Sequence, residues 1–154
     1  MNIGSGTGYP SSALSNFSPH PFVFRGKKIA SMEGFLQGLK FKSPEMQLHV
    51  FTLVGKKAKF KGKPKKWWTE QTLWFQGKPY LRHTEDYQML LDEAFECLFK
   101  NTKARKALLA TGKAVLTHSL GRSDMTKTVL TEREFVSRLT RIRRQINEDE
   151  TRPG

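Results

Sequence analysis

Three polar residues near position 35 have the types and spacing of a reactive site. Glu33, Gln37 and Lys40 stand at i, i+4 and i+7, so on a helix they would share one face. A carboxylate there can orient water, move a proton or stabilise a developing positive charge. Because each group costs free energy to bury unless it is paired or used, the stripe predicts a site directed at a polar ligand. The alternative is that these residues form only the solvated side of an amphipathic helix.

The neighbouring residues predict the elements that hold this stripe. The apolar residues of the same segment fall on the opposite side of the helix, toward a core: Met32, Phe35, Leu36 and Leu39. Ser31 is the expected N-cap. Upstream, Phe22–Phe24 has the pattern of a short strand and Gly26 that of the turn in a β-hairpin. Glu33 is therefore expected in the first turn of a capped helix, where the helix dipole favours the ionised carboxylate.

The rest of the chain is expected to be mostly helical. Residues 84–101, 102–109 and 131–146 carry apolar side chains at helical spacing, and the last segment opens with a capping box. At 154 residues the chain has the length of one domain with a single core. The predicted fold class is mainly α (α+β): a single compact helical domain over residues 1–147 with a short N-terminal β-hairpin, followed by a disordered tail over 148–154.

A specific succession of motifs occupies the first quarter of the chain: Ser15-Asn16-Phe17, Pro21-Phe22, Gly26-Lys27, Ser31-x-Glu33 and Gln37-x-x-Lys40-Phe41. This succession resembles the NADAR superfamily of NAD- and ADP-ribose-associated proteins, which are small α-helical N-glycosidases. The resemblance is specific over residues 8–41 and looser over 84–118. It implies a NADAR-like fold and cleavage of a ribose–nitrogen bond.

The chain also departs from the family pattern. Gly34 stands where the family usually has a His after the key Glu. Residues 121–127 replace the usual Gly-x-Asn-x-Leu-Gly segment, and the usual Trp-Gly segment is missing. These departures indicate a divergent member of the kind that a bacteriophage carries, which would act in the host cytoplasm.

The resemblance implies roles for individual residues. Glu33 is expected to act on the ribose, because hydrolysis of the N-glycosidic bond creates positive charge on the sugar. Lys40 is expected to neutralise a pyrophosphate or, as a neutral amine, to form a Schiff base with a ring-opened ribose; the alternative is a lysine that extends into solvent at a helix end. Gln37 would orient Glu33 or the sugar. The other expected substrate contacts are Ser15, Asn16, Phe17, Ser31, His118, Gly121 and Asp124.

The charge of the chain predicts a polyanionic partner. Lys and Arg number 27 against 14 Asp and Glu, a formal net charge of +13. Seven of the eleven residues from 56 to 66 are Lys, and the Gly and Pro among them predict a loop. Lysines there would contact phosphates and tryptophans would stack on bases; the alternative is a solvated basic loop. The expected nucleic-acid contacts are Lys56, Lys57, Lys59, Lys61, Lys63, Trp67 and Trp68.

Other features limit the class of protein. A single cysteine, Cys97, excludes an internal disulfide and fits a reducing cytoplasm, and its apolar setting predicts a core residue rather than a nucleophile. The four histidines lack metal-ligand spacing, so neither a metal nor a cofactor is expected. No apolar run reaches the length of a membrane span, and no secretory signal pattern is present, which predicts a cytoplasmic location. The last helix is expected to expose four arginines, as phosphate contacts or solvated charge: Arg138, Arg141, Arg143 and Arg144.

Three functions are compatible with these features. The first is an N-glycosyl hydrolase that removes ADP-ribose from guanine in DNA, reversing a toxin's modification, with ADP-ribosylated DNA as its partner. It accounts for both the polar stripe and the charge of +13. The second is an N-glycosidase of a phosphorylated riboflavin-pathway intermediate, which leaves the charge unexplained. The third is a non-enzymatic nucleic-acid-binding protein, which the missing His after Glu33 favours.

Overall fold

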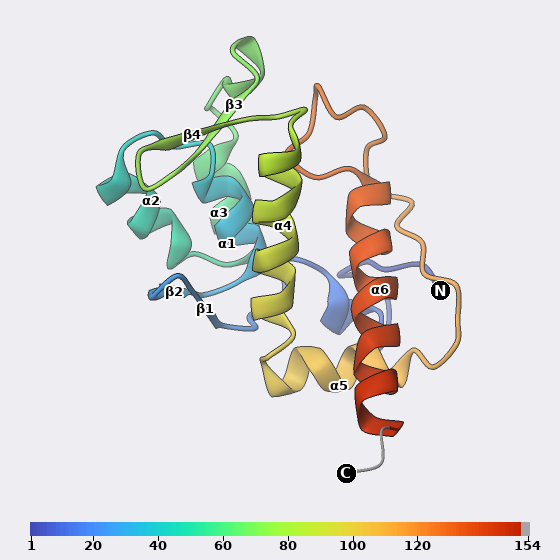
Figure 1. Ribbon diagram of the computed structural model, residues 1–154. Helices are drawn as coiled ribbons and strands as arrows, with labels where there is room; N and C mark the ends of the chain where they lie inside the picture. The colour runs from blue at the N-terminus through green and yellow to red at the C-terminus, as the bar shows by residue number, and fades with distance from the viewer. Residues whose placement is uncertain (152–154) are drawn as a thin grey trace.

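Helices account for most of the regular secondary structure in the computed structural model, which describes residues 1–151 (Figure 1). The α-helices are α1 (Met32–Gly38), α2 (Pro44–Phe51), α3 (Gly55–Gly62), α4 (Glu85–Leu98), α5 (Thr102–Ala110) and α6 (Glu132–Thr151). The strands are β1 (Phe22–Phe24), β2 (Lys27–Ile29), β3 (Thr72–Phe75) and β4 (Lys78–Leu81), and the 3-10 turns are η1 (Ser12–Leu14) and η2 (Trp67–Thr69). This arrangement confirms the α+β fold class.

The strands form two separate antiparallel hairpins. In the first, Phe22 pairs with Ile29, as the sequence predicts. The second hairpin, in which Thr72 pairs with Leu81, is not predicted by the sequence analysis. Both have a two-residue turn with positive φ at each position, 48° and 79° in the first and 49° and 86° in the second. Such turns match the right-handed twist of paired strands, which is why each ends in Gly.

A cluster of phenylalanines joins α1 to both hairpins. The ring of Phe35 in α1 lies 5.0 Å from that of Phe24 in β1 and 5.7 Å from that of Phe51 in α2. Phe24 in turn lies 5.1 Å from Phe75 in β3, edge to face. The apolar side of α1 is thus buried, as its spacing predicts, and its polar side is held in a fixed orientation.

Two glycines allow α1 and α2 to approach each other closely. A Cβ on Gly38 would stand 2.4 Å from the ring of Phe51, and one on Gly34 would stand 2.5 Å from the carbonyl oxygen of Leu53. Both distances are shorter than any real Cβ contact. Hydrogen bonds at the ends complete the packing: Ser31 Oγ accepts from the Gly34 N–H at 3.0 Å and donates to Leu53 O at 3.0 Å. The prediction that Ser31 is the N-cap of α1 is therefore confirmed.

Helices α4 and α6 lie side by side, with α5 across one end (Figure 1). The capping box that opens α6 is present, because Thr131 N–H donates to Glu134 Oε1 at 2.8 Å and Glu134 N–H donates to Thr131 Oγ1 at 3.1 Å. The prediction that Arg138 and Arg143 are solvated or phosphate-facing is wrong. Arg138 is buried 2.9 Å from Asp92, and Arg143 is buried and donates to Thr111 Oγ1 at 2.7 Å.

Two predicted boundaries differ from the structure. The lysine-rich run is a loop only over residues 63–66, because residues 55–62 form α3; Gly55 opens the helix with a positive φ of 55°, and Pro64 follows its end. The other residues of this segment are mostly Lys and Ala, which favour helix. The tail does not begin at residue 148, since α6 continues to Thr151. Residues 152–154 of the predicted tail lie outside the described residues.

Candidate active site

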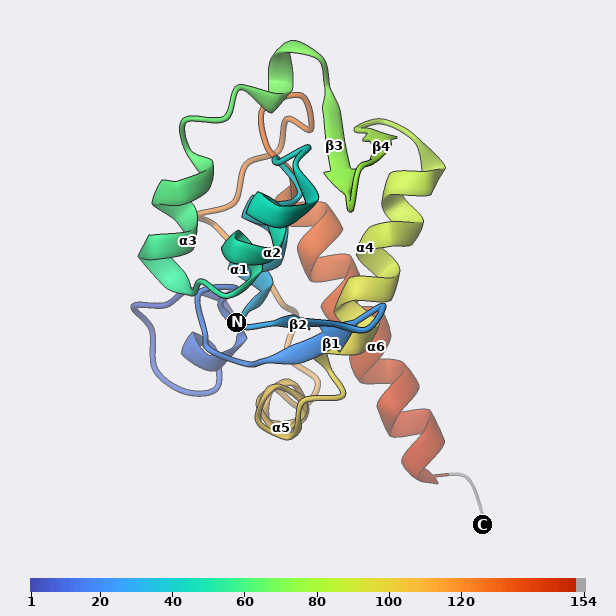
Figure 2. The ribbon, with the colours of Figure 1, turned by 90° about the vertical axis from the view of Figure 1, so that its left-hand side faces the viewer.

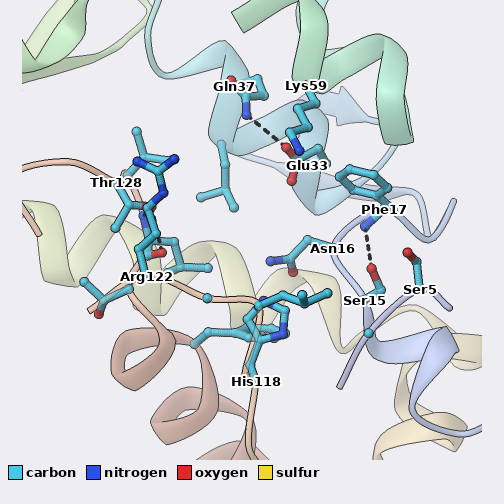
Figure 3. Close-up of a pocket in the computed structure, with 18 residues that line it drawn as sticks. Ser5, Ser15, Asn16, Phe17, Glu33, Gln37, Lys59, His118, Arg122 and Thr128 are labelled. Atoms are coloured by element: carbon cyan, nitrogen blue, oxygen red, sulfur yellow. Dashed lines mark hydrogen bonds between the residues drawn. The ribbon is translucent and has the colours of Figure 1, made fainter. Parts of the chain in front are cut away.

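The polar side of α1 opens into a cleft of about 440 Å³ (Figure 3). Its walls come from segments far apart in sequence: the N-terminal turn, the loop before β1, helices α1 and α3, the segment before α6 and α6 itself. The lining residues are Gly4, Ser5, Ser15, Asn16, Phe17, Glu33, Leu36, Gln37, Lys59, His118, Leu120, Gly121, Arg122, Thr128, Val129, Leu130, Thr131 and Phe135. The volume is within the usual range for small-ligand sites.

Glu33 is held on the wall of this cleft by its neighbours on α1 and the loop. Its backbone N–H donates to Asn16 O at 3.0 Å, and its Oε1 accepts from Gln37 Nε2 at 2.9 Å. Burial raises the pKa of the Glu33 carboxyl above its usual value, and the hydrogen bond from Gln37 and the charges of Lys40 and Lys59 partly offset this. The site therefore holds a partly desolvated, oriented carboxylate, as general acid–base or electrostatic catalysis needs.

The Gln37 side chain packs against Gly62 of α3. Its Oε1 is buried and has no hydrogen-bond partner among residues 1–151. Gly62 lies directly against it, because a Cβ at this position would stand 1.9 Å from Gln37 Oε1. The absence of a side chain at residue 62 is what leaves room for Gln37 to turn its amide nitrogen toward Glu33.

Gly62→Ala is expected to lower both turnover and stability. The added methyl group would stand 1.9 Å from Gln37 Oε1, 2.8 Å from its Cδ and 3.0 Å from its Cβ, so the Gln37 side chain must shift. A displacement of about 1 Å can cost about 100-fold in rate. Overpacking of this buried helix contact costs about 1–3 kcal/mol, which outweighs the helix preference of alanine, so the melting temperature is expected to fall. Steady-state kinetics and a thermal melt of the same preparation check this. Parent-like kcat/KM would contradict the positioning of Gln37 by Gly62.

The sequence predicts Lys40 on the same helix face as Glu33. In the structure Lys40 lies just beyond the end of α1 and outside the cleft lining. It is half-buried, and burial lowers the pKa of its amine. The charge of Glu33 raises that pKa in part, and the charge of Arg122 lowers it. Lys40 is thus coupled electrostatically to two residues that line the cleft.

Two cations stand on the cleft wall itself. Lys59 of α3 points toward the Glu33 carboxylate, and Arg122 projects into the same space from the segment before α6 (Figure 3). Both Lys59 and Arg122 are exposed. Cations placed around a carboxylate at a cleft of this size suit a ligand with phosphate groups beside its sugar.

The far wall is built around His118. Its Nδ1 is 2.7 Å from Ile3 O, and its ring lies edge to face with Phe135 at 5.2 Å. Its backbone N–H donates to Glu132 Oε1 at 3.0 Å. A Cβ on Gly121 would stand 2.8 Å from the His118 ring, so glycine is needed at that position. These contacts fix the imidazole against the N-terminal segment and α6.

The structure brings most, but not all, of the predicted site residues together. Those that line the cleft are Ser15, Asn16, Phe17, Glu33, Gln37, Lys59, His118 and Gly121. Ser31 instead caps α1 from a buried position. Asp124 is exposed and accepts hydrogen bonds from the Oγ1 and N–H of Thr126, which lower the pKa of its carboxyl. Asp124 does not line the cleft, so its prediction as a substrate contact is wrong.

Of the residues predicted to contact nucleic acid, one is buried and the others are exposed. Trp67 is buried at 7% exposure and belongs to the core, so its assignment to base stacking is wrong. Trp68 is 45% exposed. Lys56, Lys57, Lys61 and Lys63 are exposed on or next to α3.

Sequence reasoning missed the other half of the cleft. Ser5, Leu120, Arg122 and residues 128–131 line it but have no distinctive local pattern. Contacts between distant segments bring them to α1: Ile3 N–H donates to Thr117 O at 2.8 Å, Glu132 N–H to Arg122 O at 2.9 Å and Arg82 Nε to Thr128 O at 2.9 Å. One sequence feature could have pointed to this half of the cleft. Residues 121–127, which depart from the pattern of the NADAR superfamily, form the loop that carries Arg122.

Packing explains the glycine at position 34, where the NADAR proteins that the sequence resembles usually have His. Because a Cβ on Gly34 would stand 2.5 Å from Leu53 O, an imidazole at this position is incompatible with the α1–α2 contact. Position 34 also points away from the cleft, into the buried layer. The substitution therefore leaves the polar face of α1 unchanged.

Residues 1–151 contain no group of three or more His, Cys, Asp or Glu placed to bind a metal ion. Within the same residues, none of the helices combines the length and the apolar character of a membrane span. Cys97 is partly buried against the core, and burial raises the pKa of its thiol, which disfavours the nucleophilic thiolate.

Comparison with solved structures supports the predicted fold. The chain is similar to the NMR structure of the E. coli protein YbiA, with a TM-score of 0.68 over 100% of this chain and 88% of that chain. The sequence identity is 17%, so the likeness concerns the fold. It supports the NADAR-like fold that the N-terminal motifs imply.

Sequence comparison identifies relatives among bacteriophage proteins. The chain is 39% identical over 147 residues to an uncharacterized 17.1 kDa protein of Enterobacteria phage T4 from the Gp30–rIII intergenic region, covering 93% of this chain and 96% of the phage protein. Residues 8–144 match the family described as bacteriophage protein GP30.3. These relatives support the predicted bacteriophage origin. With most of its length matched, the chain belongs to the bacteriophage GP30.3 family.

Proposed function

We propose that the protein is an N-glycosidase that removes ADP-ribose from guanine bases in DNA. The observation that carries the proposal is the pairing of Glu33 with Gln37 in a cleft whose wall also bears Lys59 and Arg122. A desolvated carboxylate suits the positive charge that develops on a ribose, and the two cations suit the adjoining pyrophosphate.

In the proposed reaction, the bond between the anomeric carbon of the ribose and the guanine nitrogen breaks. Water adds its hydroxyl group to that carbon, and a proton goes to the guanine nitrogen. Glu33 orients the water and stabilises the positive sugar. Lys40 lies outside the cleft lining and does not touch the sugar. Its positive charge lowers the pKa of Glu33 and so supports the ionised carboxylate.

The expected test result is release of free ADP-ribose from a single-stranded oligonucleotide that carries one ADP-ribosyl guanine. Chromatography of the reaction would show ADP-ribose and the unmodified oligonucleotide in equal amounts. An oligonucleotide that carries ADP-ribose on thymine is the matched control and is expected to remain intact. An intact guanine substrate after long incubation would contradict the proposal.

A phosphorylated riboflavin-pathway intermediate is the second candidate substrate. The cleft volume of about 440 Å³ favours it, since a ligand of that size needs no polymer. Cleavage of such an intermediate at a rate unaffected by added DNA would favour this candidate. Tight, salt-sensitive DNA binding without turnover of either substrate would instead indicate a non-enzymatic binding protein.

A further inference from the structure

The lysines of α3 do not form one uniform basic surface. Ala58 and Gly62 are the buried side of this helix, and Gly62 packs directly on α1. Lys59 lies beside that buried side and lines the cleft. Lys56 and Lys63 stand three residues before and four residues after Lys59, so the three share one flank. Lys63 continues the row, because its φ of −54° and ψ of −41° are helical. We call Lys56, Lys59 and Lys63 the cleft row.

The remaining lysines of α3 occupy the other flank. Lys57 and Lys61 are four residues apart, so they also share one flank. At 100° per residue that flank lies across the buried side from the cleft row. We call Lys57 and Lys61 the far pair. Both sets are exposed, so the helix presents the same kind of charge in two directions, only one of which faces the cleft.

The basic surface continues beyond α3 on the same side of the molecule. Gln71 Nε2 donates to Trp68 O at 2.9 Å and to Thr126 O at 2.8 Å, and so ties η2 to the loop that carries Arg122 and Lys127 (Figure 2). Arg122 lines the cleft, and Trp68 and Lys127 are exposed. The cleft is therefore bordered by basic residues from α3 on one side and from this loop on the other.

On the α3 side of this border the charge is not balanced by acids nearby in sequence, whereas on the loop side the exposed Asp124 lies between Arg122 and Lys127. Residues 46–69 contain neither Asp nor Glu. From Lys56 to Lys63 the row extends about 10 Å along the helix, longer than one phosphate group needs. A row of cations beyond the cleft is complementary to a polyanion rather than to a single nucleotide.

We propose that a single DNA strand lies along the cleft row and crosses the mouth of the cleft toward Arg122 and Lys127. The proposal rests on the proposed function for the reaction and adds the substrate class, a polymeric single strand. A base recessed in the cleft must be unstacked from its neighbours, and a single strand allows this at the lowest cost. The far pair takes no part in this contact.

The test compares two charge-matched double variants by equilibrium binding of an unmodified single-stranded oligonucleotide. Lys56→Gln/Lys63→Gln is expected to weaken binding about 25-fold at 0.1 M salt and to reduce the salt slope by about 1.4, for two lost phosphate contacts. Lys57→Gln/Lys61→Gln removes the same charge and is expected to weaken binding by less than about 3-fold. Lys59 is left unchanged because it also acts on the charge of Glu33.

Equal weakening by the two variants, or weakening by neither, would overturn the proposed path of the strand. Thermal melts of both variants check their folding, and Lys56→Arg/Lys63→Arg, which keeps the charge, is expected to bind like the parent. Because the assay uses unmodified DNA and no turnover, it is independent of the glycosidase test. A protein that binds along the cleft row but releases no ADP-ribose would keep this inference and lose the proposed function.

Discussion

Glu33→Gln is expected to lower kcat/KM for the ADP-ribosylated oligonucleotide by about 10²- to 10⁴-fold, the usual contribution of a general acid or base. The substitution keeps the shape of the side chain and an oxygen that can accept from Gln37 Nε2. It removes only the charge and the ability to exchange a proton. Release of ADP-ribose, measured by chromatography, checks the prediction.

The same substitution is expected to leave the fold intact or to stabilise it. Burial raises the pKa of Glu33 in the folded protein, so the folded state holds this proton more tightly than the unfolded chain does. Ionising Glu33 therefore costs folding free energy as the pH rises above its ordinary value of 4.5, and Gln lacks that cost. A lower melting temperature at pH 7 would contradict this account. Glu45→Gln, at an exposed first-turn position of α2, is the matched control; it should leave turnover unchanged and lower the stability by at most about 1 kcal/mol, because the helix dipole favours a charge there.

The pH dependence of turnover follows from the same shift. If ionised Glu33 stabilises the sugar, kcat/KM falls as the pH drops through its pKa. That limb of the profile is expected above pH 4.5, because burial raises the pKa of the carboxyl. A limb below 4.5 would mean that another group, or a different environment of Glu33, controls the reaction.

Arg82→Met is expected to lower the free energy of unfolding by about 3–5 kcal/mol, the usual cost of breaking a buried ion pair. Arg82 is fully buried and donates to both oxygens of Glu134, at 3.0 and 2.5 Å, and to Thr128 O at 2.9 Å. Its loss leaves a buried carboxylate without its cation. It also releases residues 128–131, which line the cleft. Urea unfolding at pH 7 measures the first effect, and kcat/KM measures the second.

Arg25→Met is the matched control for Arg82→Met. Arg25 pairs with Glu93 at 2.8 Å, but the two side chains are 40% and 42% exposed, so the expected loss is about 1 kcal/mol or less. Equal losses for the two variants would contradict the role of burial.

The acid sensitivity of the fold depends on the same buried pair. Burial alone would raise the pKa of Glu134, but hydrogen bonds from Arg82, Gln88 and Thr131 N–H outweigh it and lower that pKa below 4.5. The stability from this pair is therefore present above the unfolded value and is lost as the pH falls through the folded one. Arg82→Met is expected to reduce this loss.

Local sequence patterns predicted the elements that contain the side of the cleft with Glu33. The hairpin at 22–29, the Ser31 cap and the buried side of α1 follow from turn residues, capping and apolar spacing within about ten positions. The same patterns failed over residues 56–62, where Gly and Pro indicated a loop and the structure has a helix. There the glycine serves a tertiary contact, because Gly62 packs against Gln37.

The sequence by itself determined the polar stripe of Glu33 and Gln37, the helix that carries it, the three helices that follow residue 84 and the charge of +13. These depend on short-range spacing and on composition, which a single chain displays directly. Only the tertiary structure decided that Lys59 and Arg122 stand on the cleft wall, that Trp67 is core and that Lys40 lies outside the lining. Those placements depend on contacts between distant segments, such as Ile3 with Thr117, and such contacts leave no periodic trace in the sequence.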